Sequence, residues 1–525
     1  MKIEASRSAF AFRTRVKGSF ARVVLLAVFA LAACNPSRER PLPDATNLVI
    51  VAVSSLRPDH MGLYGYPRRT TPSLDRFARA AFKFKAWSAS TWSTPALLSI
   101  LTSLYPSVHQ VRGYPNPGRM SENVTTLAEV VRSRGYATAA FTEGGFAHGA
   151  FGLDQGFELF CEPPIEADST TRPGLGRLPD NLRLTIDWLE QPREQPFLLF
   201  FHTQEQQAPY RPPESALRRM RPDYDEAQEH AAVALAIEAW NAGRSIGRDA
   251  ALLLTRHDLH CGLEGMPAVR DPAALQASIT GLGVAIADVP SVPELRQWLV
   301  DLYDAELAHL DDRLADLWAS LDRLCSREST VVVVLGEHGE GLGEHGSTGH
   351  GSAFFDEVLR IPLLIRIPRE SYRPRPMREA ARSVDVMPTL LDLIGHPLET
   401  LPLQGASLVT FMRGDHRERS IFSQGLRPVE SDTWVSLRFG RWHFLHDGRT
   451  QRQKLFDTFT DPAEERDVAR QHPDMLKRFL RRLHMQDKLD RRLRGKIRPA
   501  VQPLDLPPGS QQQLLRAGQL GGIFE

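Results

Sequence analysis

The sequence predicts an α/β fold in which a large, mostly parallel sheet is flanked by helices and followed by a small C-terminal α+β subdomain. One observation is a set of short runs that are apolar at almost every position, a pattern typical of strands buried on both faces. These runs are Asn47–Val53, Pro196–His202 and Val331–Leu335. The other observation is that helical patterns separate the runs, as expected for parallel strands joined by covering helices.

The length and composition are those of a globular protein with a large core. The chain has 525 residues, of which 42% are hydrophobic and 24% are charged, and this is enough for one or two domains. Its formal net charge is +1, which gives no general electrostatic basis for binding nucleic acid. We therefore expect no nucleic-acid partner.

Residues 1–33 are predicted to be a lipoprotein signal peptide. Basic residues precede an apolar run, Val23–Ala33, that is too short to span a bilayer as a helix of the mature protein. The run ends in Leu31-Ala32-Ala33 directly before Cys34, which resembles the lipidation box of bacterial lipoproteins. We expect lipidated Cys34 to anchor the protein in the bacterial cell envelope on the periplasmic side, with residues 34–45 as a tether. An ordinary secretory signal, or a short anchor, is the alternative.

The α/β domain is predicted to cover residues 46–417. After the first strand we expect helices at Ser73–Ala81 and Asn123–Arg134, the second ended by a glycine, and a strand at Tyr136–Phe141. Over residues 214–293 the pattern loosens into short helical pieces whose packing is not predicted. A stripe of leucines from Leu299 to Leu321 then predicts a long amphipathic helix.

The C-terminal part of the chain continues the pattern and then changes. A strand at Arg360–Ile367 is followed by a helix at Val384–Ile394 whose proline fits its first turn. Residues 418–490 are predicted to form the subdomain, with a strand pair around Trp434–His446 and a helix to about Asp490. Residues 491–525, rich in Pro, Gln and Gly after Lys496, form a loose tail.

The cysteines beyond Cys34 do not form a metal motif. Cys161, Cys261 and Cys325 show no Cys-x-x-Cys spacing, so a zinc site is not predicted. They allow at most one intramolecular disulfide, and the sequence does not select the pair.

Two predicted strands end in loops that are rich in polar side chains. Val331–Leu335 leads through Gly336 into a glycine-rich loop with three glutamates and three histidines. Asn47–Val53 leads directly into Ser54-Ser55-Leu56-Arg57-Pro58-Asp59-His60. Ligands of open α/β sheets bind just beyond the carboxyl ends of the strands, so the two loops are candidates for one metal or catalytic site. A solvated turn is the alternative for either loop alone.

Together the two stretches resemble the sulfatase family of the alkaline phosphatase superfamily. There, a first strand ends in Asp-Ser/Thr-Leu-Arg-x-Asp-His, and a late strand ends in Ser-Asp-His-Gly-Glu followed by Gly-Glu-His-Gly and Gly-His-Gly. Ordered matches of this kind cover most of residues 45–485. The resemblance implies an alkaline phosphatase-like fold and hydrolysis of a sulfate ester. It also implies a divalent cation, usually calcium, and a formylglycine nucleophile made from the first residue of Cys/Ser-x-Pro-x-Arg.

Four positions depart from the family pattern. Ser54 stands where the family has the first-strand Asp, and Glu337 replaces the Asp of Ser-Asp-His-Gly. Gln207 stands in place of a histidine, and Leu97 replaces the arginine after Ser93-Thr94-Pro95. Because Leu97 lacks the charge and the hydrogen-bonding fork of arginine, we expect no formylglycine at Ser93, which has the alternative role of capping a helix.

The resemblance also suggests a role for each candidate residue. A calcium site, if formed, is expected to be weak, because Ser54 removes a charged ligand and Glu337 is longer than Asp. The catalytic candidates are Ser93, His109 and His350; the metal candidates are Glu337, His338, Ser54 and Ser55; the substrate-binding candidates are Gln207 and His345.

The number of departures bears on activity. Removing one preorganised electrostatic group costs about 10²–10³ in rate. Four such losses would, if independent, cost about 10⁸ or more, which exceeds the acceleration of about 10⁶ at the low end of enzymes, although such effects rarely add. The usual sulfatase mechanism is therefore not expected here unless the site has been rebuilt.

Three functions follow as hypotheses. The first is a divergent hydrolase of sulfate, phosphate or phosphonate esters, with Ser93 as the nucleophile and Glu337 and His338 holding a metal. The second is a degenerate sulfatase-like protein that binds an anionic glycan or lipid head group without cleaving it. The third is a structural protein of the envelope.

The lipidation box gives a first testable prediction. The mature chain should begin at Cys34 and partition into detergent, since each buried CH₂ group of an acyl chain contributes about 0.8 kcal/mol. Cys34→Ala should block lipidation, as measured by metabolic labelling with a fatty acid and by phase partitioning. A variant that is still processed and membrane-bound like the parent would show that the lipoprotein assignment is wrong.

Overall fold

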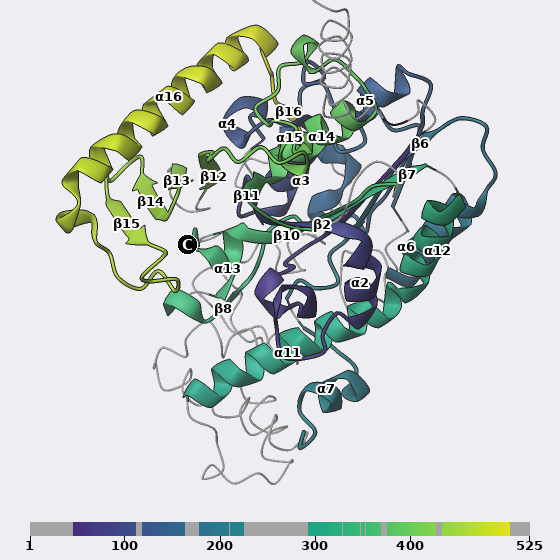
Figure 1. Cartoon of the computed structure of the whole chain (residues 1–525), viewed down its shortest axis with the longest axis horizontal. Coiled ribbons are helices and arrows are strands. Elements are labelled where there is room, and N and C mark those ends of the chain that lie inside the picture. Colours follow the sequence, from purple (N-terminus) through teal and green to yellow (C-terminus); the bar gives the residue numbers. More distant parts are fainter. Residues whose placement is uncertain are drawn as a thin grey trace, which may run out of the picture. The chain divides into compact units, whose positions relative to one another are not determined.

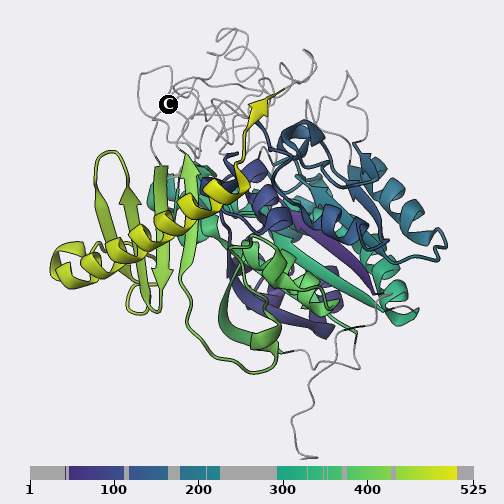
Figure 2. The same cartoon turned by 90° about the horizontal axis from the view of Figure 1, so that it is seen from above.

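The part of the chain that the computed structural model describes lies within Leu42–Glu525, and one large sheet runs through it (Figures 1 and 2). The predictions on the signal peptide, on Cys34 and Cys261, and on most of residues 214–293 lie outside the described residues. The structure describes Leu42 and residues 46–111, 118–162, 178–208, 210–224, 292–327, 329–346, 348–351, 353–368, 375–426 and 433–504.

An eight-stranded sheet in the order β11-β2-β10-β7-β1-β6-β4-β5 forms the centre of the fold. The five strands from β7 to β5 are parallel, whereas β10 runs antiparallel to both of its neighbours. The large, mostly parallel sheet of the prediction is thereby confirmed. The strands are β1 (Asn47–Val53), β2 (Ala81–Trp87), β4 (Ala137–Phe141), β5 (Leu159–Cys161), β6 (Phe197–Thr203), β7 (Thr330–Gly336), β10 (Arg360–Arg366) and β11 (Pro376–Arg382).

Helices cover both faces of this sheet, and this explains why its central strands are apolar throughout. Every residue of β1, β6 and β7 is buried. Alternate side chains of β1, such as Ile50 and Val51, enter two separate hydrophobic clusters. One face packs against α3 (Ser93–Thr102), α5 (Leu127–Arg132), α14 (Val386–Leu393) and α15 (Val409–Met412), and the other against α2 (Pro72–Phe77), α6 (Leu178–Glu190), α7 (Glu214–Met220), α11 (Val292–Arg313) and α12 (Ala315–Arg327).

Several elements differ from their predicted bounds for local reasons. The helix predicted at Asn123–Arg134 begins only at Leu127, because Thr126 and Glu129 form a capping box there. The long leucine-rich helix is two helices, α11 and α12, separated by Leu314. The helix predicted to extend to Ala81 ends earlier and is followed by strand β2, which the sequence analysis did not assign.

A four-stranded antiparallel sheet forms the predicted C-terminal subdomain. Its strands are β12 (Ile421–Leu426), β13 (Thr433–Phe439), β14 (Trp442–Asp447) and β15 (Gln453–Asp457), in sequence order. Helix α16 (Pro473–Ile497) lies across this sheet and extends beyond the predicted end near Asp490 (Figure 2). The ring of Phe479 on α16 stacks on Phe444 of β14, with 5.4 Å between the ring centroids.

Arg438 of β13 forms ion pairs with Asp356 of α13 (Asp356–Leu359) and with Glu464, at 2.8 and 2.6 Å, and so links the small sheet to the helix before β10. Cys161 and Cys325 both have free thiols. Within the described ranges, no helix is long and apolar enough to cross a membrane.

The other helices and strands named below are short. They are α4 (Pro106–His109), α13 (Asp356–Leu359), β3 (Gly118–Arg119), β8 (Gly341–Leu342), β9 (Thr348–Gly349) and β16 (Gln502–Pro503).

Strand β7 supports the loop after Gly336, so its core packing can be tested directly. Leu335 is fully buried, and Leu335→Ala should lower the free energy of unfolding by about 2–5 kcal/mol, through lost apolar contact and the cavity left behind. The matched change at half-exposed Leu159 should cost no more than about 0.5 kcal/mol. Urea denaturation of both variants measures the difference; equal losses would contradict the assignment of Leu335 to the core.

Candidate active site

The candidate site lies at the carboxyl ends of three adjacent parallel strands. Strand β1 is paired with β6 and with β7 so that Val53 lies beside both Thr203 and Gly336. The chain therefore leaves β1 and β7 at the same level, and Ser54 and Glu337 meet there. Helix α3 begins at Ser93 beside these strand ends, where it adds a hydroxyl.

Glu337 is at the centre of the site and is completely buried. Its Oε1 accepts a short hydrogen bond from Ser54, and its Oε2 accepts one from His202 Nε2 at 3.0 Å. His338 Nε2 lies 3.2 Å from Oε1. Burial alone would raise the pKa of Glu337, but the two imidazoles outweigh it and hold that pKa well below its usual range. The carboxylate is therefore ionised at neutral pH.

Ser93 and His338 form a hydroxyl–imidazole pair. Ser93 Oγ lies 3.1 Å from His338 Nε2, and both residues are fully buried. The other ring nitrogen, Nδ1, donates to the carbonyl of Gly339 at 2.8 Å. In the neutral form of this ring, Nε2 accepts from the Ser93 hydroxyl, whereas in the charged form Nε2 donates to Glu337. Burial opposes a charge on the ring, yet Glu337 and the Gly339 carbonyl raise the pKa of His338 above its ordinary value.

A second glutamate–histidine pair lies beside the first. Glu340 is buried and accepts hydrogen bonds from Ser55 and from His350 Nδ1, the latter at 3.2 Å. The Gln207 amide donates to His350 Nε2 at 2.7 Å. Burial would raise the pKa of Glu340, but His350 and Ser55 lower it. The rings of His350 and His338 stack with 4.3 Å between their centroids, so the two pairs are in contact.

The structure thus brings together seven of the predicted site residues and places two in other surroundings. His109 lies 3.2 Å from Ser99 Oγ and accepts a hydrogen bond from the backbone of Val111. His345 bonds to Glu357 at 2.8 Å and to the Ala463 carbonyl at 2.9 Å. The catalytic role of His109 and the substrate role of His345 stay predictions. The residues brought together are Ser54, Ser55, Ser93, Gln207, Glu337, His338 and His350.

Two members of the site were not identified from the sequence. His202 bonds to Glu337, and its Nδ1 is buried without a hydrogen-bond partner among the described residues. Its signal was a single polar residue near the carboxyl end of an otherwise apolar strand. Glu340 lay in the loop that the sequence analysis selected, but its tertiary contacts with Ser55 and His350 are what distinguish it from Glu344.

Comparison with known proteins identifies the family. The sequence model of the Sulfatase family matches residues 46–396, which is more than half of the chain. The chain belongs to the sulfatase family. Its fold agrees with that of the phosphonate monoester hydrolase of Agrobacterium radiobacter, with a TM-score of 0.59 and 20% identity over 87% of this chain and 96% of that one.

Two curated sulfatases illustrate the range of the similarity. The choline-sulfatase of Rhizobium meliloti (strain 1021) is 30% identical over 169 residues, which cover 32% of this chain and 32% of that protein. The N-acetylglucosamine-6-O-sulfatase of Bacteroides thetaiotaomicron is 23% identical over 491 residues, which cover 84% of this chain and 86% of that protein. The similarity of this sulfatase-family chain to its relatives can thus extend over most of its length, at low sequence identity.

The donors at the strand ends differ from the usual oxygen shell of a calcium site. Calcium usually takes about six to eight oxygen ligands, several of them carboxylates. Here the oxygens of Glu337 already accept hydrogen bonds from Ser54 and His202, and the oxygens of Glu340 accept from Ser55 and His350. In the part of the chain that the structure describes, no group of three or more His, Cys, Asp or Glu side chains is arranged to hold a metal ion.

A calcium titration tests this conclusion. The wild-type protein should gain little thermal stability from millimolar calcium, because protein donors already occupy the carboxylate oxygens. The double variant Ser54→Asp with Glu337→Asp should respond more strongly, since it supplies two short carboxylates at the strand ends. Calcium at about 100 times its dissociation constant would add about 2.7 kcal/mol to the folded state.

The measurement is the melting temperature of both proteins, with magnesium as the control ion. A wild-type response as large as that of the double variant would show that the glutamate–histidine pairs do bind calcium. The absence of any response in either protein would leave the wild-type conclusion intact and show that the two substitutions do not suffice to build the site.

Proposed function

We propose that this sulfatase-family chain is an ester hydrolase in which Ser93 is the nucleophile and His338 is its general base. The observation that carries the proposal is the 3.1 Å contact between Ser93 Oγ and His338 Nε2. This separation is within hydrogen-bond reach, which a general base requires before its pKa becomes relevant. A serine hydroxyl needs such a base because it is a weak nucleophile at neutral pH.

The geometry gives each neighbouring group a task. The Gly339 carbonyl holds the Nδ1 proton of His338, so that Nε2 takes the proton of Ser93 as its oxygen attacks. The resulting imidazolium lies 3.2 Å from the ionised Glu337 carboxylate, which stabilises it. His202 and Ser54 keep that carboxylate in place. In this proposal, proton transfer to His338 beside the charge of Glu337 replaces activation of the nucleophile by a metal ion.

The reaction proceeds in two displacements at the same centre. The Ser93 oxygen forms a bond to the sulfur or phosphorus of the ester, and the bond to the leaving oxygen breaks. The His338 imidazolium gives its proton to that oxygen. Water, deprotonated by His338, then displaces the Ser93 oxygen, which takes that proton back from the imidazolium, and sulfate or the phosphonate is released. We assign the binding of the oxygens of the transferred group to the amide of Gln207 and the ring of His350, which stacks on His338.

The substrate class is proposed from the relatives. One relative is named as an N-acetylglucosamine-6-O-sulfatase, and a protein of like fold is a phosphonate monoester hydrolase. We therefore propose an anionic ester, such as a sulfated glycan or a phosphonate monoester, as the substrate. We also propose that the protein acts at the bacterial envelope, held by lipid on Cys34.

A second function is favoured by the burial of the centre. Ser93, Glu337 and His338 have no exposed surface, so a substrate reaches the nucleophile only after side chains move. A protein that binds an anionic glycan or lipid head group at Gln207 and His350, without cleaving it, needs no such access. A purely structural role in the envelope is compatible with the same burial.

Matched serine variants distinguish these functions. Ser93→Ala should lower the hydrolysis of 4-nitrophenyl sulfate or a 4-nitrophenyl phosphonate ester by at least about 10³-fold, because the nucleophile is lost. Ser99→Ala is the control, since Ser99 lies in the same helix and also contacts a histidine, His109. His338→Gln should lose about 10²–10⁴ in rate, the usual contribution of a general base. The measurement is kcat/KM on both esters.

Two outcomes would contradict the proposal. Equal rates for Ser93→Ala and the parent would exclude Ser93 as the nucleophile. No turnover by any protein, together with a melting temperature that sulfate or a sulfated sugar raises, would favour the binding function. Mass spectrometry of the peptide containing Ser93 is expected to show an unmodified serine. A loss of two hydrogens there would instead indicate formylglycine and ordinary sulfatase chemistry.

A further inference from the structure

The C-terminal helix α16 carries a concentration of positive charge. The whole chain has a formal net charge of +1, whereas this one 25-residue helix contains nine basic and three acidic residues. The basic residues are Lys477, Arg478, Arg481, Arg482, Lys488, Arg491, Arg492, Arg494 and Lys496. The acidic residues are Asp474, Asp487 and Asp490.

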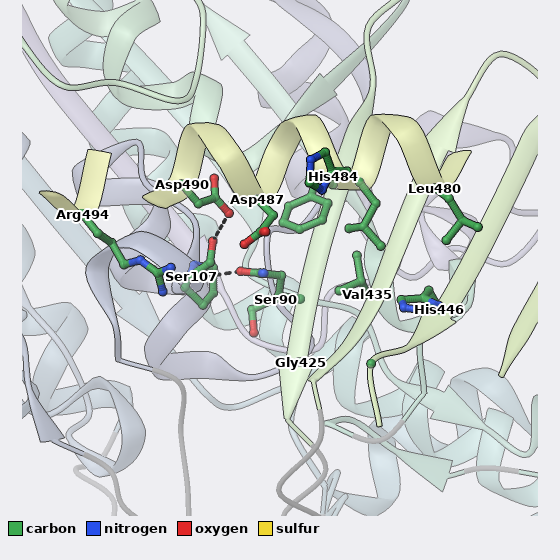
Figure 3. Close-up of a pocket in the computed structure, with 15 residues that line it drawn as sticks. Ser90, Ser107, Gly425, Val435, His446, Leu480, His484, Asp487, Asp490 and Arg494 are labelled. Atoms are coloured by element: carbon green, nitrogen blue, oxygen red, sulfur yellow. Dashed lines mark hydrogen bonds between the residues drawn. The ribbon is translucent and has the colours of Figure 1, made fainter. Parts of the chain in front are cut away.

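One face of α16, here called the inner face, packs against the small sheet and α4. The opposite, outer face of the helix is therefore turned toward solvent. Phe479 is buried against the small sheet, and Asp490 is buried with hydrogen bonds from Ser107 at 2.5 Å and from Gln404 at 2.7 Å. Figure 3 shows Asp487 and Asp490 directed toward a cavity of about 380 Å³ between the helix, α4 and the sheet. The cavity has no residue in common with the Ser93 site.

The outer face combines cations with exposed apolar groups. Met485 and Leu489 are 65% and 53% exposed, one helical turn apart. They are two of only five large apolar side chains that are exposed among the described residues. At 100° per residue they lie on one stripe with exposed basic side chains. Those side chains are Arg478, Arg481, Lys488, Arg492 and Lys496.

The acidic residues do not cancel this charge. Asp490 is buried on the inner side, and Asp487 forms an ion pair with Arg491 on the flank of the helix. Asp474 is exposed but lies in the first turn, where it pairs with Lys477. Lys488, Arg492 and Lys496 are exposed and form no ion pair with another described residue, so their charges face solvent.

We propose that the outer face of α16 binds the surface of an anionic phospholipid membrane. A helix with a basic polar face and apolar side chains at its centre lies in the plane of a lipid interface, where the apolar groups are buried and the cations meet anionic head groups. A soluble polyanion would pair with the cations but would leave Met485 and Leu489 in water. The proposal does not depend on hydrolysis at Ser93 or on lipid at Cys34.

Vesicle sedimentation tests the proposal on a chain that begins at Asn35, which lacks Cys34 but keeps the whole compact unit Leu42–Glu525. It should bind vesicles that contain phosphatidylglycerol at least about tenfold more tightly than vesicles of phosphatidylcholine alone. Raising the salt concentration should weaken the binding, because it screens the charges. Arg481→Glu, Lys488→Glu and Arg492→Glu together should abolish the preference, and Met485→Ala with Leu489→Ala should weaken binding several-fold.

A charge-matched control separates a specific face from a general effect. Arg76, Arg79 and Lys85 are exposed on the main domain, and changing all three to glutamate alters the net charge equally without touching α16. This variant should keep most of the binding. Because the changed side chains are exposed, all variants should fold. Their melting curves check this.

Three results would overturn the proposal. The first is equal binding to both kinds of vesicle, or to neither. The second is an equal loss of binding in the control variant and in the α16 triple variant. The third is tight binding of dextran sulfate together with vesicle binding that Met485→Ala and Leu489→Ala leave unchanged, which would assign the face to a soluble polyanion.

Discussion

The buried carboxylate of Glu337 is the group on which the arrangement of the site depends. It lies between the ends of three strands and has no contact with water, so its charge has to be compensated by the protein. Ser54 from the end of β1, His202 from β6 and His338 from the loop after β7 provide that compensation. Removing one partner of such a buried pair typically costs about 3–5 kcal/mol, so the same contacts fix both the strand ends and the site.

The second glutamate–histidine pair shows that this solution is used twice. Glu340 is compensated by Ser55 and His350 as Glu337 is by Ser54 and His202. In both pairs a serine after β1 donates to a glutamate after β7. An aspartate at position 54 would place a second negative charge beside Glu337, and that arrangement would need a cation. With serine there, hydroxyl and imidazole donors are sufficient, and on our proposal the chemistry of the site is correspondingly one of proton transfer.

The parts of the fold that were predictable are those whose signal is local. Strands β1, β6 and β7 are apolar along most of their length, and both strands of the β13–β14 pair were identified. Strand β2 was missed because Lys83 and Lys85 alternate with its buried phenylalanines. The antiparallel direction of β10 leaves no trace in its own sequence. The site follows the same rule. Ser93, Glu337 and His338 lie in local sequence motifs and were identified from them, whereas the role of His202 becomes visible only once β1 is paired with β6.

The burial of Ser93 restricts how any ligand approaches it. His350 retains 14% side-chain exposure and stacks on His338, whereas Ser93 and Glu337 have no exposed surface. Among these site residues His350 is therefore the most accessible to an anionic ester from solvent, and its partner Gln207 is buried. Because Ser93 has no exposed surface, cleavage at Ser93 requires side chains around it to move, whereas binding at His350 does not. The distinction between a hydrolase and a binding protein thus rests on whether the side chains that cover Ser93 can move aside.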